Sequence, residues 1–153
     1  FCLSRGLGDV YKRQDGDRPL AQLGQIQSMR MLARYLPFGI TEIHTSDAVR
    51  CYETVAPMAR SLSMDMIYWS ELSEYAYEKD KKAAINVVND IIESEAHAIV
   101  CGHNPVIPGI VAKFIGKKNF KELDHGLMPG EAFILHHRDG EVIAIDWMSA
   151  PDA

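Results

Sequence analysis

Residues 98–105 read AIVCGHNP, an apolar run that ends in Gly-His-Asn-Pro, and residues 45–50 read TSDAVR. Each stretch has the form of a short buried strand followed by a turn, and each carries a cation, His103 or Arg50, near the carboxyl end of that strand. In an open α/β sheet, ligands bind in the crevice outside the carboxyl ends of parallel strands. The sequence therefore predicts that Arg50 and His103 converge on one anion, and this pair of residue types favours phosphate.

Strand and helix patterns alternate on both sides of these two stretches. Consecutive apolar residues predict strands and a 3.6-residue spacing predicts helices. Strands are expected at 40–45, 66–69 and 98–101, helices at 21–36, 49–59, 81–93 and 105–116, a loop at 71–80, and a hairpin of 132–136 with 142–146 around an Asp-Gly turn. The helix at 49–59 is expected to start from Ser46 or Asp47 as N-cap. This order predicts an α/β domain, a three-layer sandwich around a mostly parallel sheet.

Composition limits the class of protein. A chain of 153 residues with 47% hydrophobic content forms one domain with a real core. The net charge of −5 argues against an extended nucleic-acid surface. No apolar run reaches membrane-spanning length and no signal peptide is recognisable, so we expect no membrane partner. The three cysteines form no CxxC pair, which predicts a cytoplasmic protein without a metal site.

The first fourteen residues have a separate origin in our interpretation. Residues 4–14 read SRGLGDVYKRQ, which lacks periodicity and can be encoded by a string that resembles a transposon-type sequencing-library adapter. We therefore expect residues 1–14 to be an assembly scar or a disordered segment, and residues 15–153 to be a truncated domain. A natural flexible N-terminus is the alternative.

Five pieces of sequence, in order, carry a family resemblance. They are DRPLAQLGQIQS (17–28), HTSDAVRCYETVAPMA (44–59), LSEYAY (72–77), IVCGHNP (99–105) and MPGEAFILHHRDGEVIAID (128–146). Together they resemble the histidine phosphatase superfamily, also called phosphoglycerate mutase-like. The most similar branch is the C-terminal domain fused behind MutT-like Nudix hydrolases, followed by the SixA-type phosphohistidine phosphatases.

The resemblance implies roles for individual residues. In the family, an Arg-His-Gly or Arg-His-Ala motif ends the first strand and its histidine is the nucleophile; no Arg-His pair occurs in this sequence. We therefore expect the first strand to be missing from before Asp15. Arg50 corresponds to a phosphate-binding arginine, His103 to the second catalytic histidine, and Glu74 to the general acid, with Glu71 as the fallback.

The remaining candidates are weaker. Arg18 either lines the entrance to the site and binds substrate or makes an ordinary salt bridge before the first helix. The other histidines have no metal-ligand spacing and are expected to be structural. They are His44, His97, His125, His136 and His137.

The resemblance implies metal-independent hydrolysis of a phosphomonoester through a phosphohistidine, with no cofactor. The intact parent would carry an upstream Nudix domain that sanitises nucleotides, whereas this fragment would be inactive. Two alternatives stay open: a SixA-type protein phosphohistidine phosphatase, and a noncatalytic phosphate-binding regulatory module. The expected partners are a phosphorylated small molecule, a nucleotide or a phosphohistidine protein.

Overall fold

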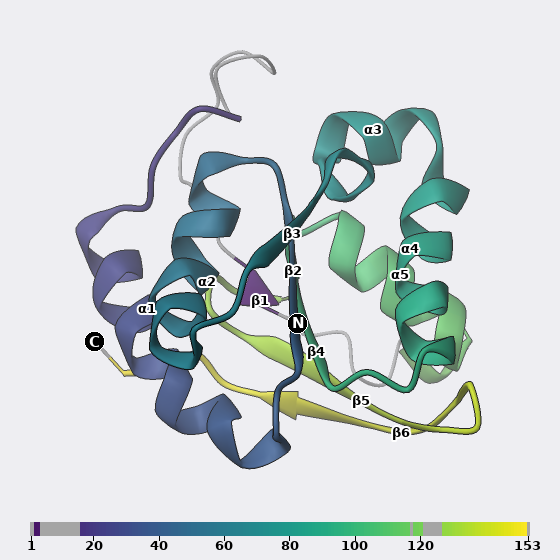
Figure 1. The fold of residues 1–153 in the computed structure, drawn as a ribbon. Coiled ribbons are helices and arrows are strands. Elements are labelled where there is room, and N and C mark those ends of the chain that lie inside the picture. The colour runs from purple at the N-terminus through teal and green to yellow at the C-terminus, as the bar shows by residue number, and fades with distance from the viewer. Residues whose placement is uncertain (1, 4–15, 117, 121–126, 153) are drawn as a thin grey trace.

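The computed structural model describes residues 2–3, 16–116, 118–120 and 127–152 and has parallel strands flanked by helices (Figure 1). Four strands pair in the order β1-β4-β2-β3, and all three pairings are parallel. Their bounds are β1 Cys2–Leu3, β2 Glu42–Ser46, β3 Met66–Trp69 and β4 Ala98–Gly102. The expected α/β class, with a mostly parallel central sheet, is confirmed.

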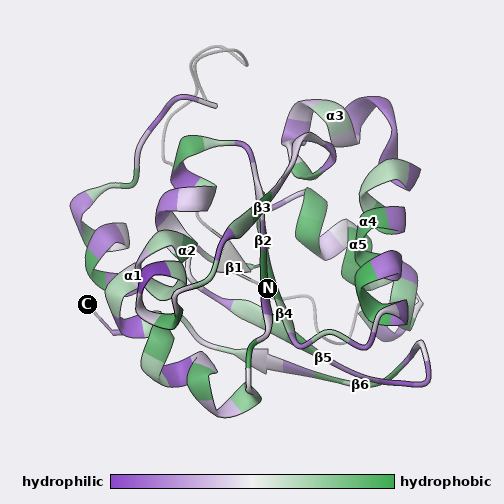
Figure 2. Cartoon of the chain, viewed as in Figure 1, coloured by the Kyte–Doolittle hydropathy of each residue, from purple (hydrophilic) through white to green (hydrophobic). Residues whose placement is uncertain are grey.

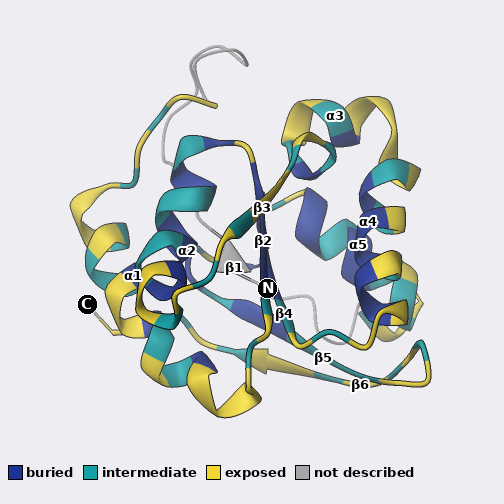
Figure 3. Ribbon diagram, viewed as in Figure 1, coloured by how far each residue is buried: buried dark blue, intermediate teal, exposed yellow. Residues whose placement is uncertain are grey.

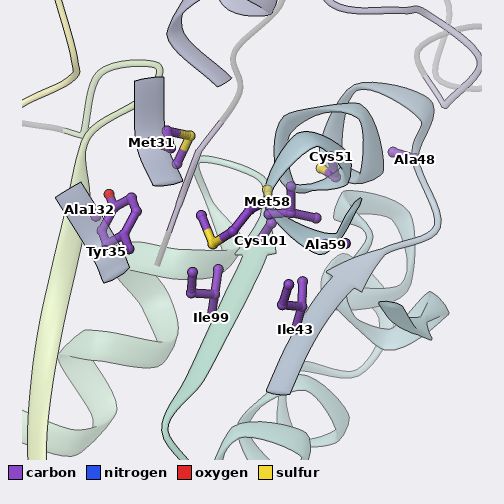
Figure 4. Close-up of a cluster of buried hydrophobic side chains, with 11 residues drawn as sticks. Met31, Tyr35, Ile43, Ala48, Cys51, Met58, Ala59, Ile99, Cys101 and Ala132 are labelled. Atoms are coloured by element: carbon purple, nitrogen blue, oxygen red, sulfur yellow. The ribbon is translucent and has the colours of Figure 1, made fainter. Parts of the chain in front are cut away.

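Alternation along β4 divides the core between the two faces of the sheet. Ile99 and Cys101 belong to a cluster with α1 (Gln22–Tyr35) and α2 (Val49–Leu62) (Figure 4). Val100, between them, belongs to a second cluster with α3 (Glu74–Lys79), α4 (Lys81–Glu93) and α5 (Val106–Ile115). Because successive strand side chains point to opposite faces, one apolar run serves both helix layers. The burial pattern in Figure 3 follows this division, with β2 and β4 buried and the outer helix faces exposed.

Helix α1 buries a different face from the one its apolar spacing suggested. The exposed fractions of Leu23 and Met29 are 53% and 64%, whereas Met31 and Tyr35 are buried. Met31 and Tyr35 share the cluster that contains the buried side chains of α2, so the tertiary partner decides the face. The hydropathy colouring in Figure 2 accordingly shows apolar positions on more than one side of α1.

Polar side chains of α1 hold the C-terminal segment. Gln27 donates to the carbonyl of Pro151, Arg30 to that of Asp152, and Arg34 to that of Ser149. These contacts join positions more than a hundred residues apart and explain why one side of α1 remains polar.

The predicted start of α2 needs correction. Helix α2 begins at Val49 with Ala48 as N-cap, rather than with Ser46 or Asp47, and no side chain caps it. The carbonyl oxygen of Gly16 instead accepts from the backbone N–H of Val49 at 2.9 Å. A loop that approaches from elsewhere in the chain therefore replaces the expected side-chain cap.

The stretch 71–80 is mostly helical, not a loop. It contains the end of the 3-10 turn η2 (Ser70–Leu72) and the whole of α3. The Ser73 hydroxyl accepts from Ala76 N–H, and the Asp80 carboxylate accepts from Lys82 N–H and starts α4. Such caps satisfy amide groups that have no partner within the helix, and here they allow a polar, aromatic segment to be helical.

The expected hairpin forms a second, antiparallel sheet of β5 (Ala132–Arg138) and β6 (Glu141–Met148). Asp139 and Gly140 form its turn with φ of 53° and 75°, as the Asp-Gly signal predicts. A cleft of about 390 Å³ is lined by residues of β4 and β5 together with neighbouring helix residues. Among the described residues, β4 pairs along one side with β2, but with β1 only at Cys101 and Gly102.

The glycine at position 109 in α5 gives a direct test of packing between α5 and α3. A Cβ on Gly109 would collide with the Tyr77 hydroxyl oxygen and lie 2.9 Å from Cζ. We expect Gly109→Ala to lower the free energy of unfolding by about 1–3 kcal/mol, the usual cost of overpacking. Urea denaturation measures this value. Gly16→Ala, where nothing lies within 4 Å, is the matched control, and Tyr77→Phe should reduce the cost.

Candidate active site

The site forms where β2 and β4 end. The two strands run in parallel register, with Thr45 opposite Cys101, so Ser46 and Gly102 reach the same edge of the sheet. Helices α2 and α5 begin just after these strands, at Val49 and Val106. The N-terminal ends of both helices therefore face this edge, where their dipoles favour an anion.

Arg50 and His103 meet at this edge. The Nη2 atom of Arg50 lies 3.1 Å from Nδ1 of His103, although the residues are 53 positions apart. Their exposed fractions are 5% and 4%. A guanidinium has only donors, so Nδ1 of His103 accepts this hydrogen bond and the ring proton resides on Nε2. The structure thus brings together the arginine and the histidine that the sequence singled out.

Two residues that the sequence analysis did not name as part of the site contact the other nitrogen of the ring. The Ser46 Oγ atom lies 3.3 Å from Nε2 of His103, and the Cys51 Sγ atom lies 3.8 Å from it. Both side chains are fully buried. Only their positions in the sequence could have pointed to them. Ser46 ends the strand that precedes Arg50, and Cys51 directly follows Arg50.

The thiol of Cys51 is acidic for a buried group. Its pKa lies well below the ordinary value of 9.0, chiefly because the Cys101 side chain hydrogen-bonds to it. Burial opposes this shift, and the adjacent His103 and Arg50 favour the thiolate. An arginine and a histidine thus make this part of the sheet edge attractive to negative charge.

Arg18 lies in a segment anchored to the beginning of α2. On one side of it, the Gly16 carbonyl accepts from Val49 N–H at 2.9 Å. On the other side, Leu20 N–H donates to the Glu53 carboxylate at 2.7 Å. Arg18 is therefore tethered near the helix that carries Arg50, and its own side chain is partly buried.

Leu72, which lies between the two carboxylate candidates in the sequence, is next to the end of β4. The Leu72 carbonyl oxygen lies 3.6 Å from where a Cβ on Gly102 would be, which places the end of η2 beside this strand terminus. Glu71 is half-buried in η2, and Glu74 is exposed on the first turn of α3. Glu74 is open to solvent two positions after Leu72.

The other described histidines make structural contacts. His97 hydrogen-bonds to the Phe38 carbonyl, His136 to Asp146, and His137 to the Ala96 carbonyl. His125 lies outside the described residues.

His44 is buried and belongs to a chain of side-chain hydrogen bonds across β2 and β3. Trp69 donates from Nε1 to His44 Nδ1 at 3.0 Å, and His44 Nε2 contacts the Glu42 carboxylate at 2.8 Å. We expect Trp69→Phe to lower the free energy of unfolding by about 1–3 kcal/mol, because a buried acceptor loses its donor. Thermal or urea unfolding measures the loss. Tyr68→Phe, at the exposed neighbouring position, should change stability by less than about 0.5 kcal/mol.

The described part of the chain has neither a cluster of metal-binding side chains nor a helix that could span a membrane. No group of three or more histidine, cysteine, aspartate or glutamate side chains there is arranged to hold a metal ion. None of the helices there is both long enough and apolar enough to cross a bilayer.

Comparison with known proteins identifies the family. Residues 10–84, which include Arg50, match the model of the histidine phosphatase superfamily (branch 1). The chain belongs to the histidine phosphatase superfamily. It is 32% identical over 144 residues to the 8-oxo-(d)GTP phosphatase of Mycolicibacterium smegmatis, a match that covers 93% of this chain and 44% of that protein. The chain thus spans less than half the length of this relative.

Solved structures agree on the fold. A structure from Agrobacterium tumefaciens assigned to the phosphohistidine phosphatase SixA superposes with a TM-score of 0.74 at 20% identity, covering 97% of this chain and 95% of that one. SixA complexed with tungstate gives a TM-score of 0.71 at 16% identity, covering 97% and 94%. A mycobacterial glucosyl-3-phosphoglycerate phosphatase complexed with VO3 gives 0.62 at 16% identity, covering 86% and 85%.

Proposed function

We propose that the parent of this chain hydrolyses a phosphomonoester through a phosphohistidine intermediate, without a metal ion. The observation that carries the proposal is the buried contact between Arg50 and His103 at the carboxyl ends of two parallel strands. An oxyanion bound between these two side chains would accept from the Arg50 guanidinium and from a ring N–H of His103. Two relatives by fold are complexed with tungstate or VO3, both of which are oxyanions.

Each residue has a role in this mechanism. Phosphoryl transfer needs an in-line nucleophile and donors that neutralise the equatorial oxygens. Arg50 offers a planar fork to two of these oxygens, and His103 donates to the phosphoryl group. Glu74 protonates the leaving oxygen, with Glu71 as the fallback, and Arg18 holds the substrate at the entrance. Water then releases phosphate from the nucleophilic histidine, which a segment outside these residues supplies.

The cleft between β4 and β5 supports a strand that carries this nucleophile. In the parallel register of β1 with β4, Cys2 is opposite Cys101 and Leu3 is opposite Gly102. A strand that continued β1 in the N-terminal direction would pass beside Val100 and Ile99, both of which line the cleft. Its C-terminal end would then lie next to His103.

One relative supports a proposal for the substrate class. That protein is an 8-oxo-(d)GTP phosphatase, and this chain matches less than half of its length. We propose that the parent carries an upstream Nudix domain and acts on a nucleotide in the cytoplasm, and that this 153-residue chain is an inactive fragment of it. The SixA-like fold favours a second candidate, a protein phosphohistidine phosphatase.

A noncatalytic phosphate-binding module is the third candidate, because the sequence has no Arg-His pair. The coding sequence of the parent upstream of Asp15 separates the candidates. An Arg-His pair at the end of a strand supports catalysis, whereas its absence supports the module.

Tungstate binding tests the site in the chain itself. We expect isothermal titration calorimetry to detect binding, and Arg50→Ala to weaken it by at least tenfold, since each charge-assisted hydrogen bond to an oxyanion contributes about 1.5–3 kcal/mol. Arg60→Ala is the matched control, because Arg60 lies on the same helix but is exposed. Equal affinities for the two variants would contradict the assignment of the site.

A further inference from the structure

The hydroxyl of Ser46 connects the end of β2 with the ring of His103. Ser46 is the last residue of β2, and His103 directly follows β4, so the parallel register brings the two side chains to the same edge of the sheet. The Oγ atom of Ser46 lies 3.3 Å from Nε2 of His103, and the exposed fractions of the two residues are 0% and 4%. The contact therefore joins the two strands that form the candidate site and is buried.

The proton and the two lone pairs of the Ser46 hydroxyl have separate partners. Its oxygen accepts from the backbone N–H of Ala48 at 3.3 Å, and its proton is donated to Oδ1 of Asp47 at 3.5 Å. A hydroxyl has one proton and two lone pairs, so the second lone pair is left for the ring. Ser46 is thus an acceptor towards Nε2 of His103, and the bond to Ala48 holds its side chain in place.

Both nitrogens of the His103 ring then have defined states. Arg50 can only donate, so Nδ1 accepts from its Nη2 atom at 3.1 Å, and Ser46 accepts the proton on Nε2. Cys51 lies 3.8 Å from the same Nε2 atom and is fully buried like Ser46. These two side chains close the Nε2 edge of the ring, so Nδ1 is the nitrogen that faces an anion bound by Arg50.

We propose that Ser46 is a positioning residue, which holds a proton on Nε2 of His103 and turns Nδ1 towards the oxyanion that Arg50 binds. The part about the oxyanion rests on the proposed function, whereas the hydrogen bond to the ring does not. When the anion replaces Arg50 at Nδ1, this nitrogen takes up a proton from solvent and donates it to the anion. The ring then carries a positive charge, which the Ser46 oxygen and, beyond it, the Asp47 carboxylate stabilise.

Loss of the Ser46 hydroxyl should affect the anion although the hydroxyl does not touch it. Without this acceptor, a buried ring N–H loses its hydrogen bond, which is costly, so the ring should rotate or move its proton to the other nitrogen. Either change breaks the contact between Nδ1 and Arg50. The ring then no longer directs the correct nitrogen at the anion, and binding should weaken.

The first test observes the ring by NMR in the full chain labelled with ¹⁵N-histidine, and His103→Gln identifies the signals. Long-range ¹H–¹⁵N spectra should show the His103 proton on Nε2, and this proton should exchange slowly with water. Saturating tungstate should add a proton to Nδ1 and leave Nε2 protonated. Ser46→Ala should abolish the slowly exchanging signal, and Ser46→Thr, which keeps a hydroxyl, should restore it.

The second test measures tungstate affinity by calorimetry. Ser46→Ala should weaken binding about tenfold, a loss typical of one hydrogen bond to a charged group, and Ser46→Thr should recover most of it. Ser28→Ala is the matched control, because Ser28 is also buried but its hydroxyl donates to the Gln25 carbonyl within α1. This control should keep the ring signal and change the affinity by less than about twofold.

Three results would overturn the inference. These are a proton on Nδ1 instead of Nε2 in the unliganded chain, a ring signal and a tungstate affinity that Ser46→Ala leaves unchanged, and loss of the ring signal in Cys51→Ala but not in Ser46→Ala. The first of these needs no substitution and does not depend on whether a variant folds.

The two tests also distinguish this inference from the proposed function. If tungstate does not bind the unchanged chain but Ser46→Ala abolishes the ring signal, the anion site fails and the hydrogen bond between Ser46 and His103 stands. If tungstate binds and Ser46→Ala abolishes the signal without any loss of affinity, the site stands and the positioning role is wrong.

Discussion

The 153-residue chain is expected to hydrolyse p-nitrophenyl phosphate about 10⁶-fold more slowly than a parent that carries an Arg-His pair upstream of Asp15. Removing the nucleophile of a covalent mechanism costs roughly this factor, because the remaining donors bind the phosphoryl group but no group accepts it. Steady-state release of inorganic phosphate measures both rates. Acid-labile phosphate on the parent, trapped during turnover, would identify the phosphohistidine.

The control for this prediction is the parent with its upstream histidine replaced by alanine. Its rate of hydrolysis should fall to that of the 153-residue chain. Its affinity for tungstate should stay within a few-fold of that of the unchanged parent. Turnover by the printed chain at a rate near that of the parent would show that the nucleophile lies within these residues, and the proposed mechanism would be wrong.

The second large effect is expected at Arg50 and His103 themselves. In the active parent, Arg50→Ala and His103→Ala should each lower kcat about 10²–10³-fold, the usual loss when one preorganised donor to a developing anion is removed. The side chains lie 3.1 Å apart and act on one group, so the double variant should lose less than the product of the single losses.

Arg60→Ala and His136→Ala are matched controls, because Arg60 is exposed on the same helix and His136 contacts Asp146 on the β5–β6 sheet. Both should leave kcat within about twofold. If the loss of kcat in the double variant equalled the product of the two single losses, Arg50 and His103 would act independently. That result would contradict their binding of one shared oxyanion.

The parallel sheet and the positions of Arg50 and His103 could be predicted because each depends on a short stretch of sequence. Residues 98–101 are a buried apolar run, and a parallel sheet places the residues that follow such runs at one edge. The family resemblance then gave Arg50 and His103 their roles. Their meeting required only that β2 and β4 be neighbours, which the register confirms.

The remaining details depend on tertiary packing. The apolar residues of α1 occupy more than one side, so the buried face was decided by α2 and by the C-terminal segment. The start of α2 depends on Gly16, a residue more than thirty positions away. Ser46 and Cys51 contact His103 because two separate segments of the chain come together in the fold. No spacing within either segment predicts these contacts.

The side of β4 that faces the cleft has a consequence for handling the protein. Among the described residues, β4 pairs with β1 only at Cys101 and Gly102, while Ile99 and Val100 line a cleft of about 390 Å³. A strand edge that is only partly paired recruits extended backbone that reaches it. Concentrated preparations should therefore form particles that grow by edge-to-edge addition, visible as rising light scattering. A short apolar peptide, added in excess to occupy that edge, should keep the preparation clear.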